Sequence, residues 1–499
     1  MEESYSQLKQ RLAEVKDLDA IAGLMGWDQQ TMMPPRGAGV RAEQMATIAR
    51  LSHERFTDDE IGRLLNDLTE FEASLPADSD EASLIRVTRR DWNKARRVPT
   101  ELAAELAHAA ASGYEAWIAA RASSDFAKFL PALERNVEVK RRYIACFEGA
   151  PYDVLLDDFE PGLTTGEVSA VFDRLKAGLR PLVERIAARP DAVDDSCLTG
   201  DFPSDRQRAL VLRIIERFGY NPEGWRLDPT AHPFAQSLAT TDIRLTTRYD
   251  ERNLAMALFG TIHECGHGLY EEGISPSLER TPLAHGCSMA LHESQSRLWE
   301  NLVGRGRPFW RFAFPLLREA FPDHFAAIDD ETVYRAVNKM RPSLIRVEAD
   351  EVTYPLHIIL RFELECDLFE GDLSPTDLPD AWNTKMREYL GVEVPDVANG
   401  VLQDVHWSAG LFGYFPTYAL GTVVAGQIWE RVRVDLPELD EQFARGEFLP
   451  LREWLREHLH QDGRKFTPKE TIARVAGGPI DPEPFLRYVT ARVEEFYGG

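Results

Sequence analysis

The sequence predicts a mainly α-helical fold, for three reasons: apolar periodicity, turn signals between the periodic segments, and a strand pattern in one stretch. Apolar residues recur at spacings of three and four in residues 4–27, 99–122 and 483–497, which is the pattern of amphipathic helices. Turn-forming clusters such as 32–39 (MMPPRGAG) separate such segments. Residues 242–250 (DIRLTTRYD) instead alternate apolar and polar side chains, which predicts a strand.

The organisation of the chain favours one helical body. We find no internal repeat, low-complexity tract or long Gly/Ser linker in the 499 residues, and a chain of this length can bury a large core. We therefore expect a single helical domain over 1–499. Its soft subdivision is an N-terminal helical part (1–200) and a core (201–499) that contains the chemistry.

The charge balance argues against two classes of partner. Lys and Arg number 57 against 82 Asp and Glu, a formal net charge of −25, so binding to nucleic acid or anionic lipid through bulk charge is not expected. The five cysteines include no CxxC pair, which favours a reducing compartment over a disulfide framework. Residues 1–15 are charged throughout and show no signal peptide, so we expect a cytoplasmic protein.

Residues 405–429 form a stretch without Asp, Glu, Lys or Arg. Its length alone would permit a membrane span. The stretch nevertheless holds four glycines and a proline, which are poor residues for a long regular helix. We interpret it as an uncharged lining inside the protein and expect no membrane association.

The stretch FGTIHECGHGLYEEG, residues 259–273, carries the strongest chemical signal. On a helix, His263 and His267 share one face about 5–6 Å apart, so both imidazoles can bind one ion. Glu264 can then reach a metal-bound water, which is why H-E-x-x-H is a metallopeptidase signature.

Glycines at 260, 266 and 268 interrupt this helix, and each costs about 1 kcal/mol relative to Ala in a helix interior. They make sense if another backbone or a substrate must come close. An alternative is a surface helix with two solvated histidines, but the glycines weigh against it.

A catalytic zinc site needs a third protein ligand and an open fourth position. A metzincin would need Gly at 270 and His at 273, but the chain has Tyr270 and Gly273, which excludes that class. Glu293, on a predicted helix over 290–305, is the favoured third ligand. His285 is a substitute, and Glu300 is a weaker one.

Further motifs make the chain resemble the carboxypeptidase Taq family of zinc carboxypeptidases over nearly its whole length. They follow one another in the order of the family. They are HPF at 232–234, D-x-R-x-T with Asp242, Arg244 and Thr246, HESQ at 292–295, I/V-R-x-x-A-D with Ile345, Arg346, Ala349 and Asp350, and G-x-x-Q-D-x-H-W with Gly400, Gln403, Asp404, His406 and Trp407.

The resemblance implies a helical, groove-containing body similar to neurolysin and angiotensin-converting enzyme, with a small β-sheet beside the zinc-binding helix. It further implies a homodimer that binds one zinc ion per chain. Cobalt can occupy similar ligands, so it is a possible substitute. Such enzymes remove C-terminal residues with broad specificity from peptides with a free carboxylate. We therefore expect Glu264 to be the general base, and His406 and Tyr418, with Tyr414 less firmly, to stabilise the transition state.

A carboxypeptidase must also recognise the terminal carboxylate, for which a bidentate arginine is the natural partner. Arg346 is the first candidate and Arg244 the second, and Gln403 is expected on the same wall. An ion pair between Arg346 and a nearby acid is the alternative interpretation of that arginine.

Two rival functions stay open at this point. One is an oligoendopeptidase or dipeptidyl carboxypeptidase of the same cylinder type. The other is a helical peptide-binding or scaffold protein with a vestigial metal site. Cleavage of peptides with a blocked C-terminus distinguishes the first rival, and metal analysis with a peptide-release assay distinguishes the second.

Overall fold

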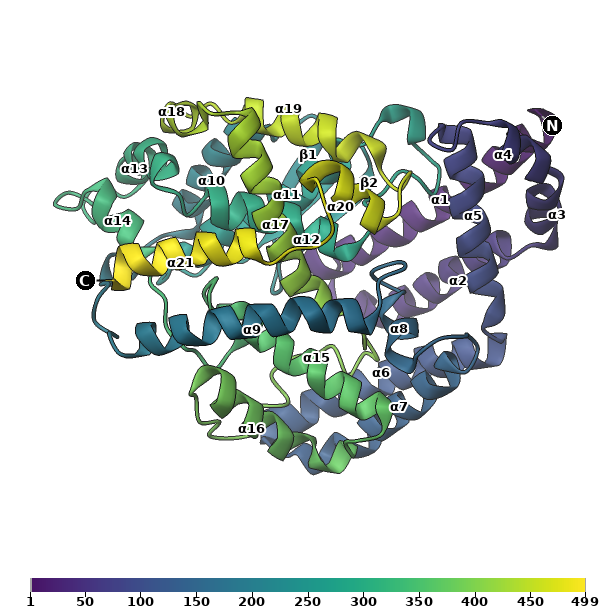
Figure 1. Ribbon diagram of the computed structural model, residues 1–499, viewed down its shortest axis with the longest axis horizontal. Coiled ribbons are helices and arrows are strands. Elements are labelled where there is room, and N and C mark those ends of the chain that lie inside the picture. Colours follow the sequence, from purple (N-terminus) through teal and green to yellow (C-terminus); the bar gives the residue numbers. More distant parts are fainter. Residues whose placement is uncertain (1, 499) are drawn as a thin grey trace.

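The computed structural model describes residues 2–498, and most of them lie in helices (Figure 1). The prediction of a mainly α-helical fold is confirmed. The three segments with the clearest periodicity form α1 (Glu2–Thr31), α6 (Thr100–Ser123) and α21 (Glu483–Tyr497). The two ends of the chain lie at opposite ends of the long axis (Figure 1).

The helices fall into three groups in space. The first five form an arm at the right of Figure 1, which we call the N-terminal arm (residues 2–97). A second group lies below the long helix α9, and a third lies above it, beside α21. The remaining helices are α2 (Ala38–Phe56), α3 (Asp59–Asp67), α4 (Thr69–Ser74), α5 (Asp80–Arg97), α7 (Leu130–Ile144), α8 (Pro151–Leu156), α9 (Thr165–Ala187), α10 (Ser204–Phe218), α11 (Leu254–Glu272), α12 (Met289–Arg297), α13 (Arg307–Ala320), α14 (Asp330–Ala336), α15 (Tyr354–Glu370), α16 (Leu378–Leu390), α17 (Pro416–Asp435), α18 (Leu439–Ala444), α19 (Leu449–His458) and α20 (Pro468–Ala476).

A small sheet lies against α11. Its strands are β1 (Trp225–Pro229), β2 (Ala235–Ala239) and β3 (Asp242–Thr247), in the order β1-β3-β2. The predicted strand over 242–250 is β3, which is three residues shorter than expected. It pairs in parallel with β1 and antiparallel with β2. The expected small sheet beside the helix with the two histidines is therefore present.

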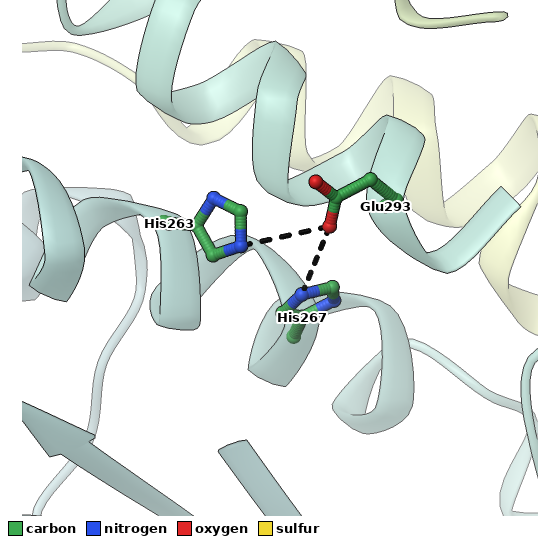
Figure 2. Close-up of side chains that lie close together, drawn as sticks. All are labelled: His263, His267 and Glu293. Atoms are coloured by element: carbon green, nitrogen blue, oxygen red, sulfur yellow. Dashed lines mark ion pairs between the residues drawn. The ribbon is translucent and has the colours of Figure 1, made fainter. Parts of the chain in front are cut away.

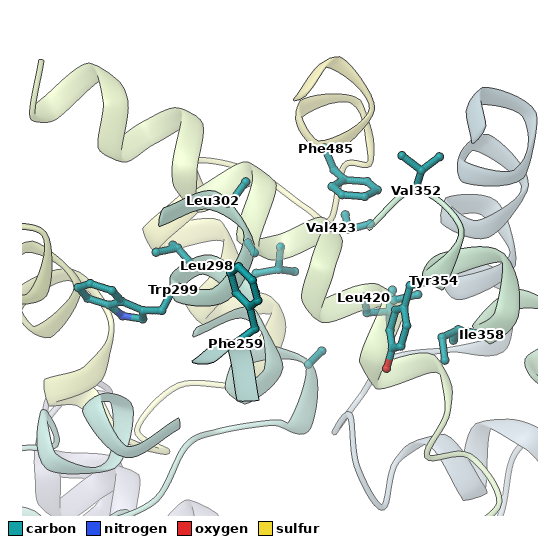
Figure 3. Packing of buried hydrophobic residues seen from close by; sticks show 14 of the residues in the cluster. Phe259, Leu298, Trp299, Leu302, Val352, Tyr354, Ile358, Leu420, Val423 and Phe485 are labelled. Atoms are coloured by element: carbon teal, nitrogen blue, oxygen red, sulfur yellow. The ribbon is translucent and has the colours of Figure 1, made fainter. Parts of the chain in front are cut away.

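Helix α17 contains the second half of the charge-free stretch and passes through the interior of the protein. Leu420 on this helix lies near Tyr354 of α15, and Val423 lies near Phe485 of α21 (Figure 3). No helix among residues 2–498 is both long and apolar enough to cross a membrane. The missing charges are thus explained by burial among other helices.

Two hydrophobic cores hold the chain together. The larger core runs from Leu102 to Tyr497 and draws side chains from both sides of residue 200. The smaller core joins α1, α3 and α5 of the N-terminal arm to Ile274, Leu278 and Leu283 of the connection between α11 and α12. The larger core is continuous across residue 200, and the smaller core ties the arm to residues 274–283; we therefore keep one helical domain over 1–499 as a proposal.

Candidate metal centre and active-site cleft

Helix α11 presents His263 and His267 one turn apart on the same face. Asn253 begins the helix, and its side chain accepts a hydrogen bond from the backbone N–H of Ala255. The centroids of the two imidazole rings lie 5.1 Å apart. Other faces of this helix are buried in the core, so the two histidines are fixed in position relative to the sheet and α12.

Glycines let α11 approach its neighbours closely. A Cβ on Gly266 would lie 2.6 Å from the carbonyl oxygen of Gln295 on α12, and one on Gly268 would lie 2.5 Å from the ring of Trp225 on β1. A Cβ on Gly260 would meet only an ordinary contact at 3.8 Å. The expectation that another backbone comes close is therefore confirmed at Gly266, whereas Gly268 makes room for an indole ring.

Helix α12 brings Glu293 to the two histidines. Ser288 begins this helix by accepting a hydrogen bond from the backbone N–H of Leu291. One carboxylate oxygen of Glu293, Oε2, lies 3.6 Å from Nε2 of His263 and 3.6 Å from Nε2 of His267 (Figure 2). The three side chains therefore converge from two helices on one point.

These three residues fit a divalent metal ion. Their ligand atoms all lie within 4.8 Å of one another, and zinc forms bonds of about 2.0–2.2 Å to such nitrogen and oxygen atoms. Each imidazole also has a partner for its other nitrogen. Nδ1 of His263 lies 2.9 Å from Oε2 of Glu300, and Nδ1 of His267 lies 2.9 Å from Nδ1 of His292. Such outer partners orient metal-binding histidines.

Glu264 follows the first histidine and lies at the wall of the cleft. Its side chain is buried, and burial raises its pKa to about 7. His263 opposes this shift, whereas the charges of Glu293 and Glu300 add to it. A carboxylate with a pKa near neutrality is suited to accept and return a proton.

The cleft has a volume of about 790 Å³ and is large enough for several residues of a peptide. Strand β2, helix α11 and residues 279–293 form its walls, and α1 closes one side. Tyr414 and Tyr418 line it near the two histidines. The possible metal ligands thus lie at the surface of a deep depression, where a substrate has access to them.

The charge-free stretch supplies a group of aromatic hydroxyls and one imidazole. Nε2 of His406 lies 3.2 Å from the hydroxyl of Tyr418, and the rings of Tyr414 and Tyr418 lie 5.3 Å apart between centroids. Burial lowers the pKa of His406 to about 3, against the opposing charge of Asp404. It raises the pKa of Tyr414 to about 12. At neutral pH these groups are uncharged.

Arg346 is buried outside the lining of the cleft, and its guanidinium carbon lies 5.1 Å from the ring centroid of Tyr418. Its Nε and Nη2 atoms donate to Oδ1 of Asp404, at 3.0 and 2.8 Å, and Nη1 donates to the hydroxyl of Tyr354. Arg361 donates to the other oxygen of Asp404 at 2.7 Å. Burial favours a higher pKa for Asp404, but these two guanidinium groups hold that pKa far below its usual value. An ion pair with a nearby acid was the alternative expected for Arg346, and the structure contains one.

Comparisons with known proteins agree with this arrangement. The sequence model of the family described as carboxypeptidase Taq (M32) metallopeptidase matches residues 7–493. The chain belongs to this M32 family. It is therefore a metallocarboxypeptidase, a hydrolase of peptides.

Relatives of this chain match it over nearly their whole length. Thermostable carboxypeptidase 1 of Thermus thermophilus is 42% identical over 100% of the chain and 99% of the relative. Carboxypeptidase 1 of Bacillus subtilis is 39% identical over 99% and 98%. The crystal structure of an M32 carboxypeptidase from Deinococcus radiodurans superimposes with a TM-score of 0.96 at 39% identity, covering 99% of this chain and 100% of that one.

Two other residues considered as third ligands occupy different places in the M32 chain. Glu300 contacts Nδ1 of His263, on the far side of the ring from Glu293. His285 belongs to a second group of possible ligands, with Glu271 and His292. Neither reaches the point where the two Nε2 atoms meet Glu293.

Arg244 and Gln403, the other residues expected to bind substrate, form hydrogen bonds to neighbouring groups of the protein. Arg244 on β3 forms two hydrogen bonds to Asp242, at 2.9 and 3.0 Å, and stacks over Trp27 of α1. Gln403 accepts from the backbone N–H of Arg346 and donates to two backbone carbonyls. Gln403 thus positions the backbone that carries Arg346.

Sequence reasoning missed several residues of the M32 site. Tyr354 contacts Arg346, and Arg361 contacts Asp404. His292 touches a possible metal ligand, and Glu271 contacts His292 and His285. Two signals were available. Glu271 lies one further turn along the same face of α11 as the two histidines, and His292 directly precedes Glu293.

Proposed function

We propose that this metallocarboxypeptidase holds one zinc ion per chain on His263, His267 and Glu293. The convergence of two Nε2 atoms on one oxygen of Glu293 carries the proposal. Because the Nδ1 atoms face Glu300 and His292, the Nε2 atoms are left to bind a cation. Two histidines, one glutamate and an open position form a ligand set of catalytic zinc sites, and cobalt can occupy the same ligands.

The chemistry follows from the neighbouring side chains. When bound, zinc supplies a water molecule of lowered pKa and a positive charge beside the scissile carbonyl. Glu264 accepts a proton from the attacking water and delivers it to the leaving nitrogen. The hydroxyl of Tyr418, with His406 behind it at 3.2 Å, donates a hydrogen bond to the oxyanion. Tyr414 lies close enough to Tyr418 to orient its hydroxyl.

In this proposal, Arg346 binds the terminal carboxylate of the substrate. Its contacts with Asp404 and Tyr354 use three of the five N–H groups of a guanidinium. The remaining two can bind a carboxylate, and Asp404 keeps the planar group in a fixed orientation. Arg244 is the second candidate; it uses two of its five N–H groups on Asp242 and also has donors left.

Broad specificity, which the resemblance implies, stays part of this proposal, although charged side chains such as Lys16, Glu279 and Arg280 line the cleft beside the uncharged Tyr414 and Tyr418. We further propose that the enzyme acts as a homodimer in the cytoplasm. A requirement for a free carboxylate distinguishes the proposed enzyme from an oligoendopeptidase, and release of single residues instead of dipeptides distinguishes it from a dipeptidyl carboxypeptidase.

The experiment that tests this proposal combines two measurements on the purified protein. Metal content is determined by elemental analysis, and release of single amino acids is followed from a peptide with a free C-terminus and from its amidated counterpart. We expect one zinc ion per chain and release from the free peptide alone. An active preparation without metal, or equal cleavage of the amidated peptide, would refute it.

A further inference from the structure

A chain of hydrogen-bonding groups leads away from the second candidate ligand. Nδ1 of His267 lies 2.9 Å from Nδ1 of His292, and Nε2 of His292 lies 2.6 Å from Oε1 of Glu271. The same oxygen of Glu271 accepts a hydrogen bond from the backbone N–H of Gly286 and lies 2.6 Å from Nδ1 of His285. His267 and Glu271, one turn apart on α11, are therefore the two ends of a relay that passes through His292 of α12.

The relay has one consistent arrangement of protons when His267 binds a metal. A metal on Nε2 of His267 leaves the proton of that ring on Nδ1, which must then donate to Nδ1 of His292. Because Nδ1 of His292 accepts, its ring proton lies on Nε2 and is donated to Glu271. Each neutral imidazole thus has one donor and one acceptor nitrogen, as its chemistry requires.

The ring of His292 is held in the orientation that this relay needs. A Cβ on Gly286 would lie 2.6 Å from Cδ2 of His292, so the backbone of the connection packs directly against the ring. The rings of His267 and Tyr270 flank it at centroid distances of 5.0 and 4.9 Å. Only a small part of the side chain is exposed, at 12%. Rotation of the ring is therefore restricted.

A second metal ion on Glu271, His285 and His292 is the rival interpretation of this cluster. The three ligand atoms do lie within 4.8 Å of one another. Such an ion would need the lone pair on Nε2 of His292, which would move the ring proton to Nδ1. Two N–H groups, on His267 and His292, would then face each other at 2.9 Å. Metal binding at the first site therefore disfavours metal binding at the second.

We propose that His292 and Glu271 are positioning residues that fix the tautomer and the ring orientation of His267. This inference rests on the proposed metal centre. His263 reaches a carboxylate directly, through Glu300, whereas His267 reaches one through a second imidazole. The two histidine ligands thus differ in how they are supported, although they occupy equivalent positions on one helix.

The experiment uses two substitutions of the same residue in the full-length protein. His292→Phe keeps the ring volume but removes both nitrogens, whereas His292→Gln keeps an acceptor and a donor in the side chain. We expect the zinc dissociation constant, measured by competition with a chelator, to rise about 10- to 100-fold in His292→Phe and distinctly less in His292→Gln. The d–d absorption spectrum of the cobalt-loaded protein is expected to shift in His292→Phe.

His324→Phe is the matched control, because it removes a half-buried imidazole that binds the carbonyl of Cys197. We expect its zinc affinity and cobalt spectrum to equal those of the unchanged protein. If His292→Phe matched the unchanged protein in both readouts, the relay would be refuted. Two zinc ions in the unchanged protein and one in His292→Phe would establish the rival site. Failure of the unchanged protein to bind zinc would refute the proposed metal centre instead.

Discussion

Gly421 of α17 and Glu293 of α12 are in direct contact: a Cβ added at 421 would lie 2.6 Å from the Cβ of Glu293. The same Cβ would lie 2.9 Å from the backbone oxygen of Ala290. Helix α17 thus forms the backing of the proposed third ligand. Any enlargement at 421 must displace α12, because the contact involves backbone as well as side-chain atoms.

We therefore expect Gly421→Ala to weaken zinc binding by at least tenfold and to lower the free energy of unfolding by about 1–3 kcal/mol, as overpacking does. Chelator competition and urea denaturation measure the two effects. Gly260→Ala is the control, because its new Cβ meets nothing closer than 3.8 Å. That variant should be unchanged or more stable by up to about 1 kcal/mol. Equal zinc affinity in both variants would contradict this account of Gly421.

Glu264→Gln should keep zinc and lose turnover. The amide preserves the volume of the buried side chain but cannot accept a proton from water. We expect kcat to fall by about 10²–10⁴, the range for a general base, while zinc content stays at that of the unchanged enzyme. Activity assays beside elemental analysis test this, and surviving turnover would exclude Glu264 as the base.

Tyr418→Phe removes the hydroxyl that we assign to the oxyanion, together with the partner of His406. The loss should appear in kcat, by roughly 10²–10³, because the hydrogen bond strengthens only in the transition state. Tyr414→Phe should have a much smaller effect. Steady-state kinetics on one peptide compares the two variants. A change confined to KM would assign Tyr418 to ground-state binding.

Arg346→Ala should raise KM steeply for peptides with a free carboxylate. Its partner Asp404 remains paired with Arg361 in that variant, which limits the cost in stability. Arg361→Ala is the matched control. It also removes a guanidinium group that binds Asp404, but the side chain of Arg361 is 0% exposed. The control should lose stability without a selective rise in KM. Equal changes in KM for both variants would move carboxylate recognition to another residue.

The ionisation of the buried Glu160 makes the free energy of unfolding depend on pH. Burial raises its pKa from 4.5 to about 8, although the N–H of Ala290 and the hydroxyl of Ser288 oppose the shift. The folded protein therefore keeps a proton that the unfolded chain loses. This contribution to stability is complete below pH 4.5 and is lost as the pH rises toward 8.

Glu160→Gln cannot ionise, so its free energy of unfolding relative to the unchanged protein should increase between about pH 5 and pH 8. At about 1.4 kcal/mol for each pKa unit, the relative gain amounts to several kcal/mol. Urea denaturation at the two pH values measures it. Glu115→Gln, at an exposed position of α6, should show no such trend. A flat difference for Glu160→Gln would contradict the raised pKa.

The features that the sequence could predict are those set by local spacing. The i, i+4 relation places His263 and His267 on one helix face wherever that helix lies. Apolar periodicity predicts both ends of α21 correctly. The predicted helix over 290–305 is only partly regular, because it widens into a π-helix at Leu298–Val303. Strands β1 and β2 were missed because each has five residues and no clear alternation of burial.

The contacts that complete the site could not be predicted, because they join distant parts of the chain. Asp404 meets Arg361 across 43 residues, and His263 meets Glu300 across 37. Spacing rules cannot find such pairs, since any of the 82 acidic residues could be the partner. The close approach at Gly266 was foreseen from residue type, but the identity of the approaching helix was not.

The connection between α11 and α12 also carries Ile274, Leu278 and Leu283 into the smaller core of the N-terminal arm. Its two ends are the helices that carry His267 and Glu293. A shared ion would cross-link those ends and close a loop, as a disulfide does, so that the loop has less entropy to lose when it packs. An ion at the proposed metal centre would thereby favour the docking of the arm onto this connection.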